Sequence, residues 1–145
     1  MRFAFSDAGS GLATNASSEV TVSAEGITPS VGGTATDNAG NTATPSFGPI
    51  KIDRTPPSIN GSRTPEPNAS GWNNTDVTVN FACSDALSGV AAGPLSPQVV
   101  STEGAGQSRS ATCTDVAGNG SALTINDINI DKSPPNRPAV SVSPL

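Results

Sequence analysis

The sequence predicts an all-β chain built of small β-sandwich units in tandem, and three observations lead to this expectation. Ser, Thr, Asn, Ala, Gly and Pro are abundant, whereas residues that favour helices are scarce. The stretch DVTVNFACSD (76–85) alternates apolar and polar residues, as a half-buried strand does. The sequence also repeats itself at an offset of about 78 positions, which indicates an array of similar units.

The repeat is visible in several stretches along the chain. The corresponding pairs are TDNAGN (36–41) with TDVAGN (114–119), FAFSDAGSGLA (3–13) with FACSDALSGVA (81–91), Glu25-Gly26 with Glu103-Gly104, and IKIDRTPP (50–57) with INIDKSPP (128–135). No gap is needed, and about 25 of roughly 55 positions agree, far more than composition alone would produce.

This periodicity divides the chain into three parts. Residues 54–133 form a complete repeat, residues 1–53 form a repeat whose first strands are missing, and residues 134–145 form the start of a third repeat or a C-terminal tail. A unit of about 78 residues suits one small domain. We therefore expect a fragment of a longer array, in which the partners of each repeat are its neighbours in the same chain.

The complete repeat contains four stretches that favour strands. They are 76–85, a weaker stretch at 95–102, 108–115, and 121–131. In the first of them Val77, Val79, Phe81 and Cys83 share one face. Five to seven short strands in so few residues, with turns between them, are typical of a two-sheet sandwich. Phe5, Phe47 and Phe81 all fall at core-facing positions.

Two local features indicate where these strands turn or change phase. The D-x-A-G-N motif places Gly and Asn where a tight hairpin turn needs positive φ. Along 121–131 the apolar positions change phase, from Leu123 and Ile125 to Ile128 and Ile130, and Phe47 followed by Ile50 repeats the change. A change of phase at the same place in both repeats predicts a β-bulge.

The two cysteines, Cys83 and Cys113, correspond to Phe5 and Ala35 in the first repeat. One repeat therefore has a cysteine pair where the other has a large and a small apolar residue, as expected of two side chains that fill one shared volume. We infer a core disulfide, which would stabilise a thin sandwich by roughly 3–4 kcal/mol. Two unrelated buried thiols are the alternative. A persistent disulfide indicates an oxidising compartment, hence a secreted or cell-surface protein.

The chain resembles the bacterial immunoglobulin-like repeats of large surface and secreted proteins. The resemblance rests on the strand ending in FAFSD or FACSD, the D-x-A-G-N hairpin and the I-D-[RK]-[TS]-P-P junction, and it covers nearly the whole chain. It implies tandem immunoglobulin-like β-sandwich repeats joined by short, semi-rigid Pro-Pro linkers. It also places Cys83 on the second strand and Cys113 on the sixth, the positions of the inter-sheet bridge.

The composition argues against several classes of function. The sequence contains no His, so neither a Ser–His nor a Cys–His catalytic pair can form, and we expect no enzyme activity. A net charge of −5 with seven scattered Lys and Arg residues argues against nucleic acid and against an anionic membrane surface. No apolar run is long enough to insert into a membrane.

A calcium site at the junction between repeats is one expectation. The immunoglobulin-like topology would bring Asp53, Asp85, Asp115 and Asn119 to one end of the sandwich, and oxygen ligands from several segments suit Ca²⁺. The alternative is that Asp85 and Asp115 only cap their own turns by hydrogen bonds. A titration with Ca²⁺ that gives neither heat nor a higher melting temperature would exclude the calcium site.

Trp72 is the sole Trp, and it has two possible roles. It caps one end of the sandwich, or it offers a platform for a sugar. The sequence as a whole predicts a structural spacer of a bacterial surface or secreted protein, of the kind found in adhesin stalks, whose host-surface or polysaccharide ligand is bound by other domains. An accessory carbohydrate- or ligand-binding module of a secreted hydrolase is the alternative.

Overall fold

The computed structural model describes residues 1–13, 17–92 and 95–138. Every regular element in these ranges is a β-strand, so the predicted all-β class is confirmed. The chain divides into two compact units, Met1–Thr55 (unit 1) and Pro56–Leu145 (unit 2), which are described separately below. The part of the chain that is described contains no helix long and apolar enough to cross a lipid bilayer.

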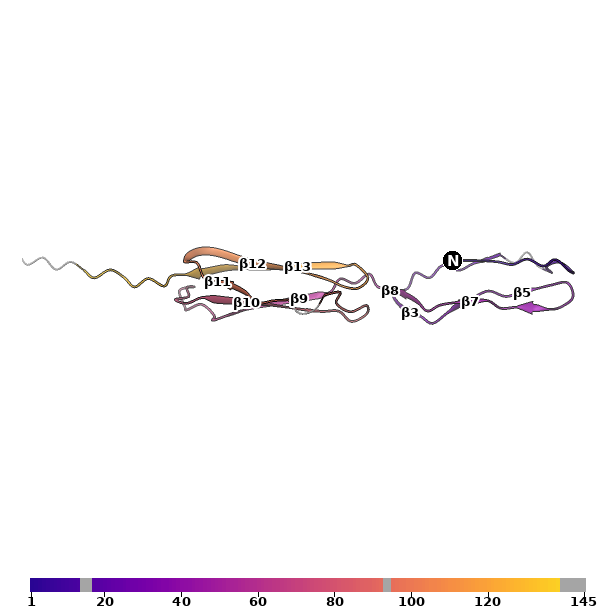
Figure 1. The fold of residues 1–145 in the computed structure, drawn as a ribbon, viewed down its shortest axis with the longest axis horizontal. Coiled ribbons are helices and arrows are strands. Elements are labelled where there is room, and N and C mark those ends of the chain that lie inside the picture. The colour runs from indigo at the N-terminus through magenta and orange to yellow at the C-terminus, as the bar shows by residue number, and fades with distance from the viewer. Residues whose placement is uncertain (14–16, 93–94, 139–145) are drawn as a thin grey trace, which may run out of the picture. The chain divides into compact units, whose positions relative to one another are not determined.

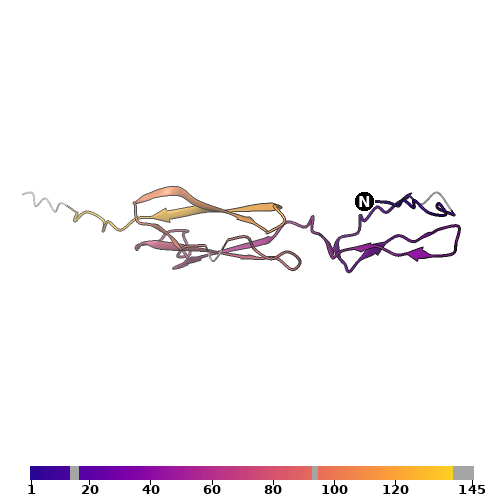
Figure 2. The same cartoon turned by 45° about the vertical axis from the view of Figure 1, so that its right-hand side comes forward.

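Unit 2 contains two sheets (Figure 1). The first consists of β9 (Ser58–Thr64), β10 (Val77–Ser84) and β11 (Gln98–Val100), with β10 in the centre. The second is a long hairpin of β12 (Gly104–Thr114) and β13 (Gly120–Ile130). Strands that are paired within each sheet are antiparallel. The two sheets form separate layers (Figure 2), an arrangement consistent with a β-sandwich.

The core of unit 2 lies between these two layers. Its fully enclosed side chains come from both sheets: Val77, Val79, Phe81, Val100, Ile128 and Ile130. The alternation predicted for β10 is confirmed, because Val77, Val79 and Phe81 are buried and the residues between them are not. The weak strand predicted at 95–102 is shorter than expected, but its Val100 enters the core.

The predicted β-bulge is present in unit 2. The strand partners are Arg109↔Ile125 and then Gln107↔Ile128. Between these two pairs β13 contains one more residue than β12. Asp127 occupies the extra space with a positive φ of 56°. Ile125 and Ile128 can therefore both face inward although they are three positions apart, which would place them on opposite faces of a regular strand.

Side chains close the two seams between the sheets. At one seam Gln98 Nε2 donates to Ser110 O (3.0 Å) and Arg109 Nη2 donates to Val99 O (3.1 Å), which joins β11 to β12. At the other seam Arg63 Nη1 donates to Asp127 O (3.0 Å), which joins β9 to β13. Gly61 of β9 leaves room for Leu123 and Ile125, since an added Cβ would lie only 3.0 Å from either side chain.

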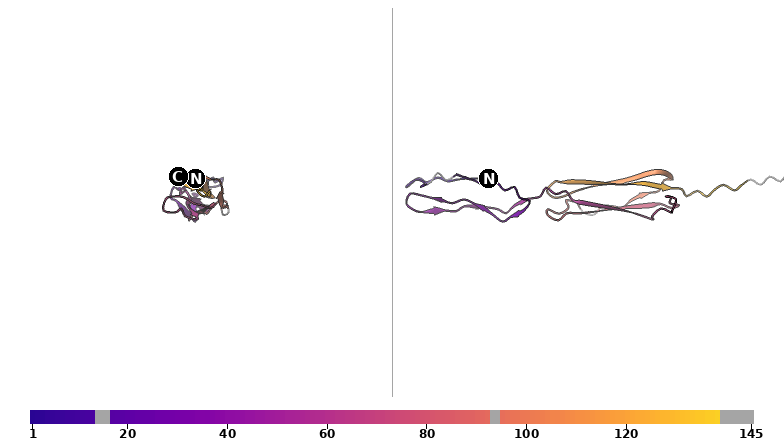
Figure 3. Two further views of the ribbon diagram at one scale, coloured as in Figure 1. Left: turned by 90° about the vertical axis from the view of Figure 1, so that its left-hand side faces the viewer. Right: turned by 180° about the vertical axis from the view of Figure 1, so that it is seen from behind.

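Unit 1 consists of short antiparallel pairs (Figure 3). They are β1 (Arg2–Ala4) with β2 (Ser17–Glu19), β3 (Gly26–Thr28) with β8 (Ile50–Ile52), β4 (Val31–Gly32) with β7 (Ser46–Phe47), and β5 (Ala35–Thr36) with β6 (Thr42–Ala43). Ala35 is the one buried apolar residue among the described residues of this unit.

Two predictions for unit 1 are wrong. The change of phase after Phe47 is not a bulge: between the pairs Thr28↔Ile50 and Val31↔Phe47 both strands advance by three positions, so the register is kept. Pro29 and Pro49 lie in this gap, and a proline cannot donate to a strand ladder, so both strands are interrupted there. Phe47 itself is 59% exposed, since the described residues of unit 1 include no counterpart of β9, the strand that covers Ile125 in unit 2.

Two neighbouring valines on β11 test the position of the core. Val100 is fully buried and Val99 is 53% exposed. We expect Val100→Ala to lower the free energy of unfolding of unit 2 by roughly 2–3 kcal/mol, because it removes buried methyl groups and leaves a cavity. Val99→Ala should cost less than about 0.5 kcal/mol. Urea unfolding measures both, and equal losses would contradict the layer arrangement.

Candidate functional site

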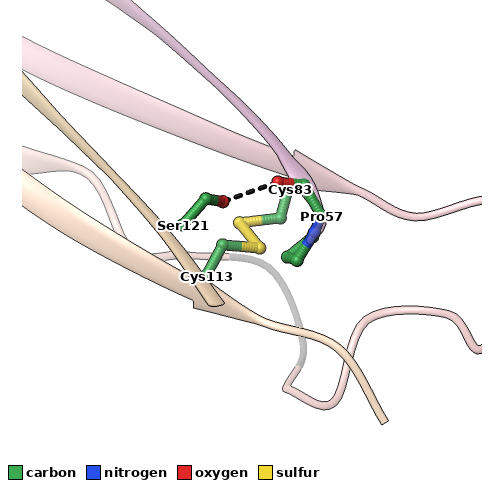
Figure 4. Close-up of a disulfide and its surroundings, with 4 residues drawn as sticks. All are labelled: Pro57, Cys83, Cys113 and Ser121. Carbon is green, nitrogen blue, oxygen red and sulfur yellow. Dashed lines mark hydrogen bonds between the residues drawn. A yellow bond between two sulfur atoms is a disulfide. The ribbon is translucent and has the colours of Figure 1, made fainter. Parts of the chain in front are cut away.

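A disulfide joins the two sheets of unit 2 (Figure 4). Cys83 lies near the end of β10 and Cys113 near the end of β12, and their Cα atoms are 6.2 Å apart. Cys113 is buried and Cys83 half-buried. Beside the bond, Ser121 Oγ donates to Pro57 O at 2.6 Å, which attaches β13 to the segment that leads into β9. The predicted disulfide is therefore present and joins the two sheets, with Cys83 on the second strand of unit 2 as expected and Cys113 on the fourth described strand instead of the sixth.

The corresponding pair in unit 1 also shares a space. Phe5 and Ala35 line one small cavity of about 160 Å³, together with Asp7, Asp37 and Asn41. Ala35 is buried and Phe5 half-buried. These two apolar side chains thus lie at one place in their unit, as the paired substitution by cysteines predicts.

The hairpin turn of the D-x-A-G-N motif is held by the same hydrogen bonds in both units. In unit 2 the amide N–H of Asn119 donates to Asp115 Oδ1 and its Nδ2 donates to Asp115 Oδ2, both at 2.8 Å. In unit 1 Asn41 donates in the same way to Asp37, at 2.8 and 2.7 Å. The glycines of the two turns, Gly118 and Gly40, have φ of 96° and 91°, so the positive φ predicted for Gly is confirmed, whereas Asn119 and Asn41 do not adopt a positive φ.

The loop that follows β10 is also capped by an aspartate. Asp85 Oδ1 accepts from the N–H groups of Leu87 (3.1 Å) and Gly89 (2.7 Å). Asp7 accepts from the N–H of Gly11 at 2.6 Å in unit 1. In each unit this loop contacts the hairpin turn, since Val116 N donates to Gly89 O and Asn38 N donates to Gly11 O, both at 2.9 Å. The capping role predicted for Asp85 and Asp115 is thus present.

The calcium prediction has a more limited outcome. Asp85 and Asp115 bring carboxylate oxygens within 4.8 Å of each other, and Asp115 is 1% exposed. Asn119 lies beside Asp115 through the bonds described above. Asp53 belongs to unit 1, and the two units are described separately, so its convergence with this pair stays a prediction, as does bound Ca²⁺.

Trp72 lies in a loop that is attached to the end of β13. Asn68 Oδ1 accepts from the N–H groups of Ser70 (2.9 Å) and Trp72 (3.0 Å), and Asn68 N donates back to Trp72 O at 2.9 Å. The next residue, Asn73, is buried, and its N–H donates to Asn129 O at 2.9 Å. Trp72 is 38% exposed, so part of this residue faces solvent while its backbone is held by the loop.

Glu25 and Glu103 occupy corresponding positions in the two units, but no role was predicted for them from the sequence. Glu25 Oε1 accepts from Thr55 Oγ1 at 2.6 Å and from the N–H groups of Arg54 and Thr55 at 3.1 Å. Glu103 Oε1 accepts from the N–H of Lys132 at 2.7 Å and from Ser133 Oγ at 3.2 Å. Each glutamate thus attaches the segment that leaves its unit. A carboxylate kept at one place in both repeats was the signal that could have revealed this role.

The basic residue of the same segment adds a second attachment. Arg54 Nη1 donates to Ser23 O at 2.8 Å, and Lys132 Nζ donates to Ser101 O at 2.7 Å. Lys132 also forms an ion pair with Asp76. The residues before each Pro-Pro pair are therefore part of the folded unit.

Comparison with protein-family models, with curated proteins and with solved structures found no match for this chain.

Reduction of the disulfide tests its contribution to unit 2. We expect dithiothreitol to lower the free energy of unfolding by about 3–4 kcal/mol, because the bond closes a loop across 30 residues in the unfolded chain. Trp72, the sole Trp, reports the unfolding of this unit in urea by its fluorescence. Mass spectrometry of the unreduced protein should find no free thiol. Two free thiols, or an unchanged urea midpoint, would contradict the bond.

The turn of unit 1 should open in acid. The side-chain hydrogen bond from Asn41, followed by the one from its N–H, lowers the pKa of Asp37. A lowered pKa in the folded state means that this carboxylate stabilises the turn fully above the ordinary Asp value of about 3.9, and that the effect is lost as pH falls through the lower folded value. NMR should show the Asn41 side-chain amide shifting only below about pH 4. In Asp37→Asn that titration should vanish; its persistence would assign it to another group.

Proposed function

We propose that this chain is a non-enzymatic spacer: a stretch of tandem immunoglobulin-like repeats from a bacterial cell-surface or secreted protein, of the kind that forms an adhesin stalk. The observation that carries the proposal is the agreement of the two units in their internal hydrogen bonds. The hydrogen bonds that close the hairpin turn, cap the preceding loop and attach the segment leaving the unit recur at corresponding positions, although more than half of the aligned residues differ. Recurrence of the same hydrogen bonds in successive units is expected of an array whose function depends on the shape of each unit.

The exit attachments support this role further. Because Glu25 and Glu103 fix the residues that precede each Pro-Pro pair, the connector begins from a held position. Proline restricts its own φ and the conformation of the residue before it. A connector of this kind is stiffer than a Gly/Ser tether. We infer that it limits how freely successive repeats turn, as a stalk requires.

The disulfide supports an extracellular location. Disulfides persist in oxidising compartments, and a small unit with six side chains in its core gains stability from such a bond. We propose no catalytic role for Asp85 or Asp115, because their carboxylates accept hydrogen bonds from their own turns. The partners that we propose are the neighbouring repeats and, through other domains, a host-surface or polysaccharide ligand.

An accessory carbohydrate-binding module is the second candidate, and the position of Trp72 favours it. Trp72 is 38% exposed and its backbone is held by the loop, so its indole could stack on a sugar ring. A spacer should pass through insoluble polysaccharides without retention, and Trp72→Ala should behave as the parent chain does. Retention that Trp72→Ala abolishes would replace the spacer role by the binding role. Urea unfolding of both proteins controls for loss of the fold.

A further inference from the structure

The first and last strands of unit 2 lie side by side and run in the same direction. Ser121, at the start of β13, donates to Pro57 O just before β9. Arg63, near the end of β9, donates to the carbonyls of Asn126 (3.4 Å) and Asp127 (3.0 Å), further along β13. The chain enters unit 2 at the start of β9 and leaves it at the end of β13. Tension on the two ends therefore pulls these strands in opposite directions along their lengths.

Such a load acts on all the bonds between the two strands at once. Sliding β9 along β13 requires the hydrogen bonds of Ser121 and Arg63 to break together, and it also moves Gly61 away from Leu123 and Ile125, against which it packs. Bonds loaded together resist more than bonds opened one after another. β9 is also paired with β10 along its whole length, so the same load shears its contacts with both β10 and β13.

The two cysteines of the disulfide lie on the strands that are paired with β9 and β13. Ile59 of β9 is the strand partner of Cys83, and Ser121 of β13 is the strand partner of Cys113. Once β9 has separated from both β10 and β13, the load follows the covalent path from Cys83 through the disulfide to Cys113. The segment between the two cysteines, which are 30 positions apart and enclose β11 and most of β12, then carries no load.

The described residues of unit 1 include neither a disulfide nor a counterpart of the contact between β9 and β13. Phe5 and Ala35 occupy the cysteine positions, Ala43 occupies the position of Ser121, and no strand corresponds to β9. Its one buried apolar residue is Ala35.

We propose that unit 2 is a load-bearing element with a limited extension: β9, held by β10 and β13, resists tension in shear, and the Cys83–Cys113 bond keeps the segment between the cysteines closed after β9 has separated from both. The biological meaning of this inference rests on the proposed spacer role, but the mechanical behaviour belongs to the chain alone. Unit 1 yields first and without such a limit.

Single-molecule stretching of the whole chain, held at its two ends, tests the proposal. Without reductant, the later unfolding step should be shorter than with dithiothreitol by the length of the closed segment. For 30 residues this difference is roughly 100 Å of contour length. The earlier step should be the same in both conditions. Equal later steps with and without dithiothreitol would overturn the closed segment.

A matched pair of arginine variants tests the path of the load. Arg63 joins β9 to β13, whereas Arg109 joins β12 to β11 inside the closed segment. We expect Arg63→Ala to lower the force of the later step and Arg109→Ala to leave it unchanged in the absence of reductant. Equal effects of the two variants would overturn the shear pair. Urea unfolding gives the equilibrium loss of each variant, against which the forces are compared. Retention on polysaccharides would refute the spacer role and leave these forces as they are.

Discussion

The bond between Cys83 and Cys113 is the constraint on which unit 2 depends. Two sheets with so few large apolar side chains between them gain little more free energy from burial than folding costs in conformational entropy. A covalent link across the core restricts the unfolded chain and leaves fewer ways for the sheets to separate. The rest of the unit is arranged around this link: β9 and β13 pass beside it, and the hairpin turn with its buried Asp115 begins two residues beyond Cys113.

Much of unit 2 could be predicted because its signals are local. Strict alternation in 76–85 identifies β10 and its buried face, and the D-x-A-G-N motif identifies the turn, since each requires only a few neighbouring residues. The change of phase after Ile125 also gave the bulge correctly, because an odd spacing between inward-facing residues needs an extra residue on that strand. The disulfide came from a comparison between repeats, in which two positions changed together.

What could not be predicted depends on partners that are distant in sequence. Phe47 has the same phase as Ile125, but burial requires a covering strand, and periodicity does not show whether that strand is present. The exit attachments of Glu25 and Glu103 act across about 30 residues, so no local pattern reveals them. The location of Asp53 relative to Asp85 is a question of the same kind.

The side chains along the seams of unit 2 have a consequence for crowded arrays. A strand edge with free N–H and C=O groups is a template on which another chain can pair, and chains packed densely at a surface would meet such edges constantly. In unit 2 the carbonyls of Val99, Ser110 and Asp127 are already occupied by Arg109, Gln98 and Arg63. Long polar side chains folded over the edges thus protect the unit against aggregation without adding a strand.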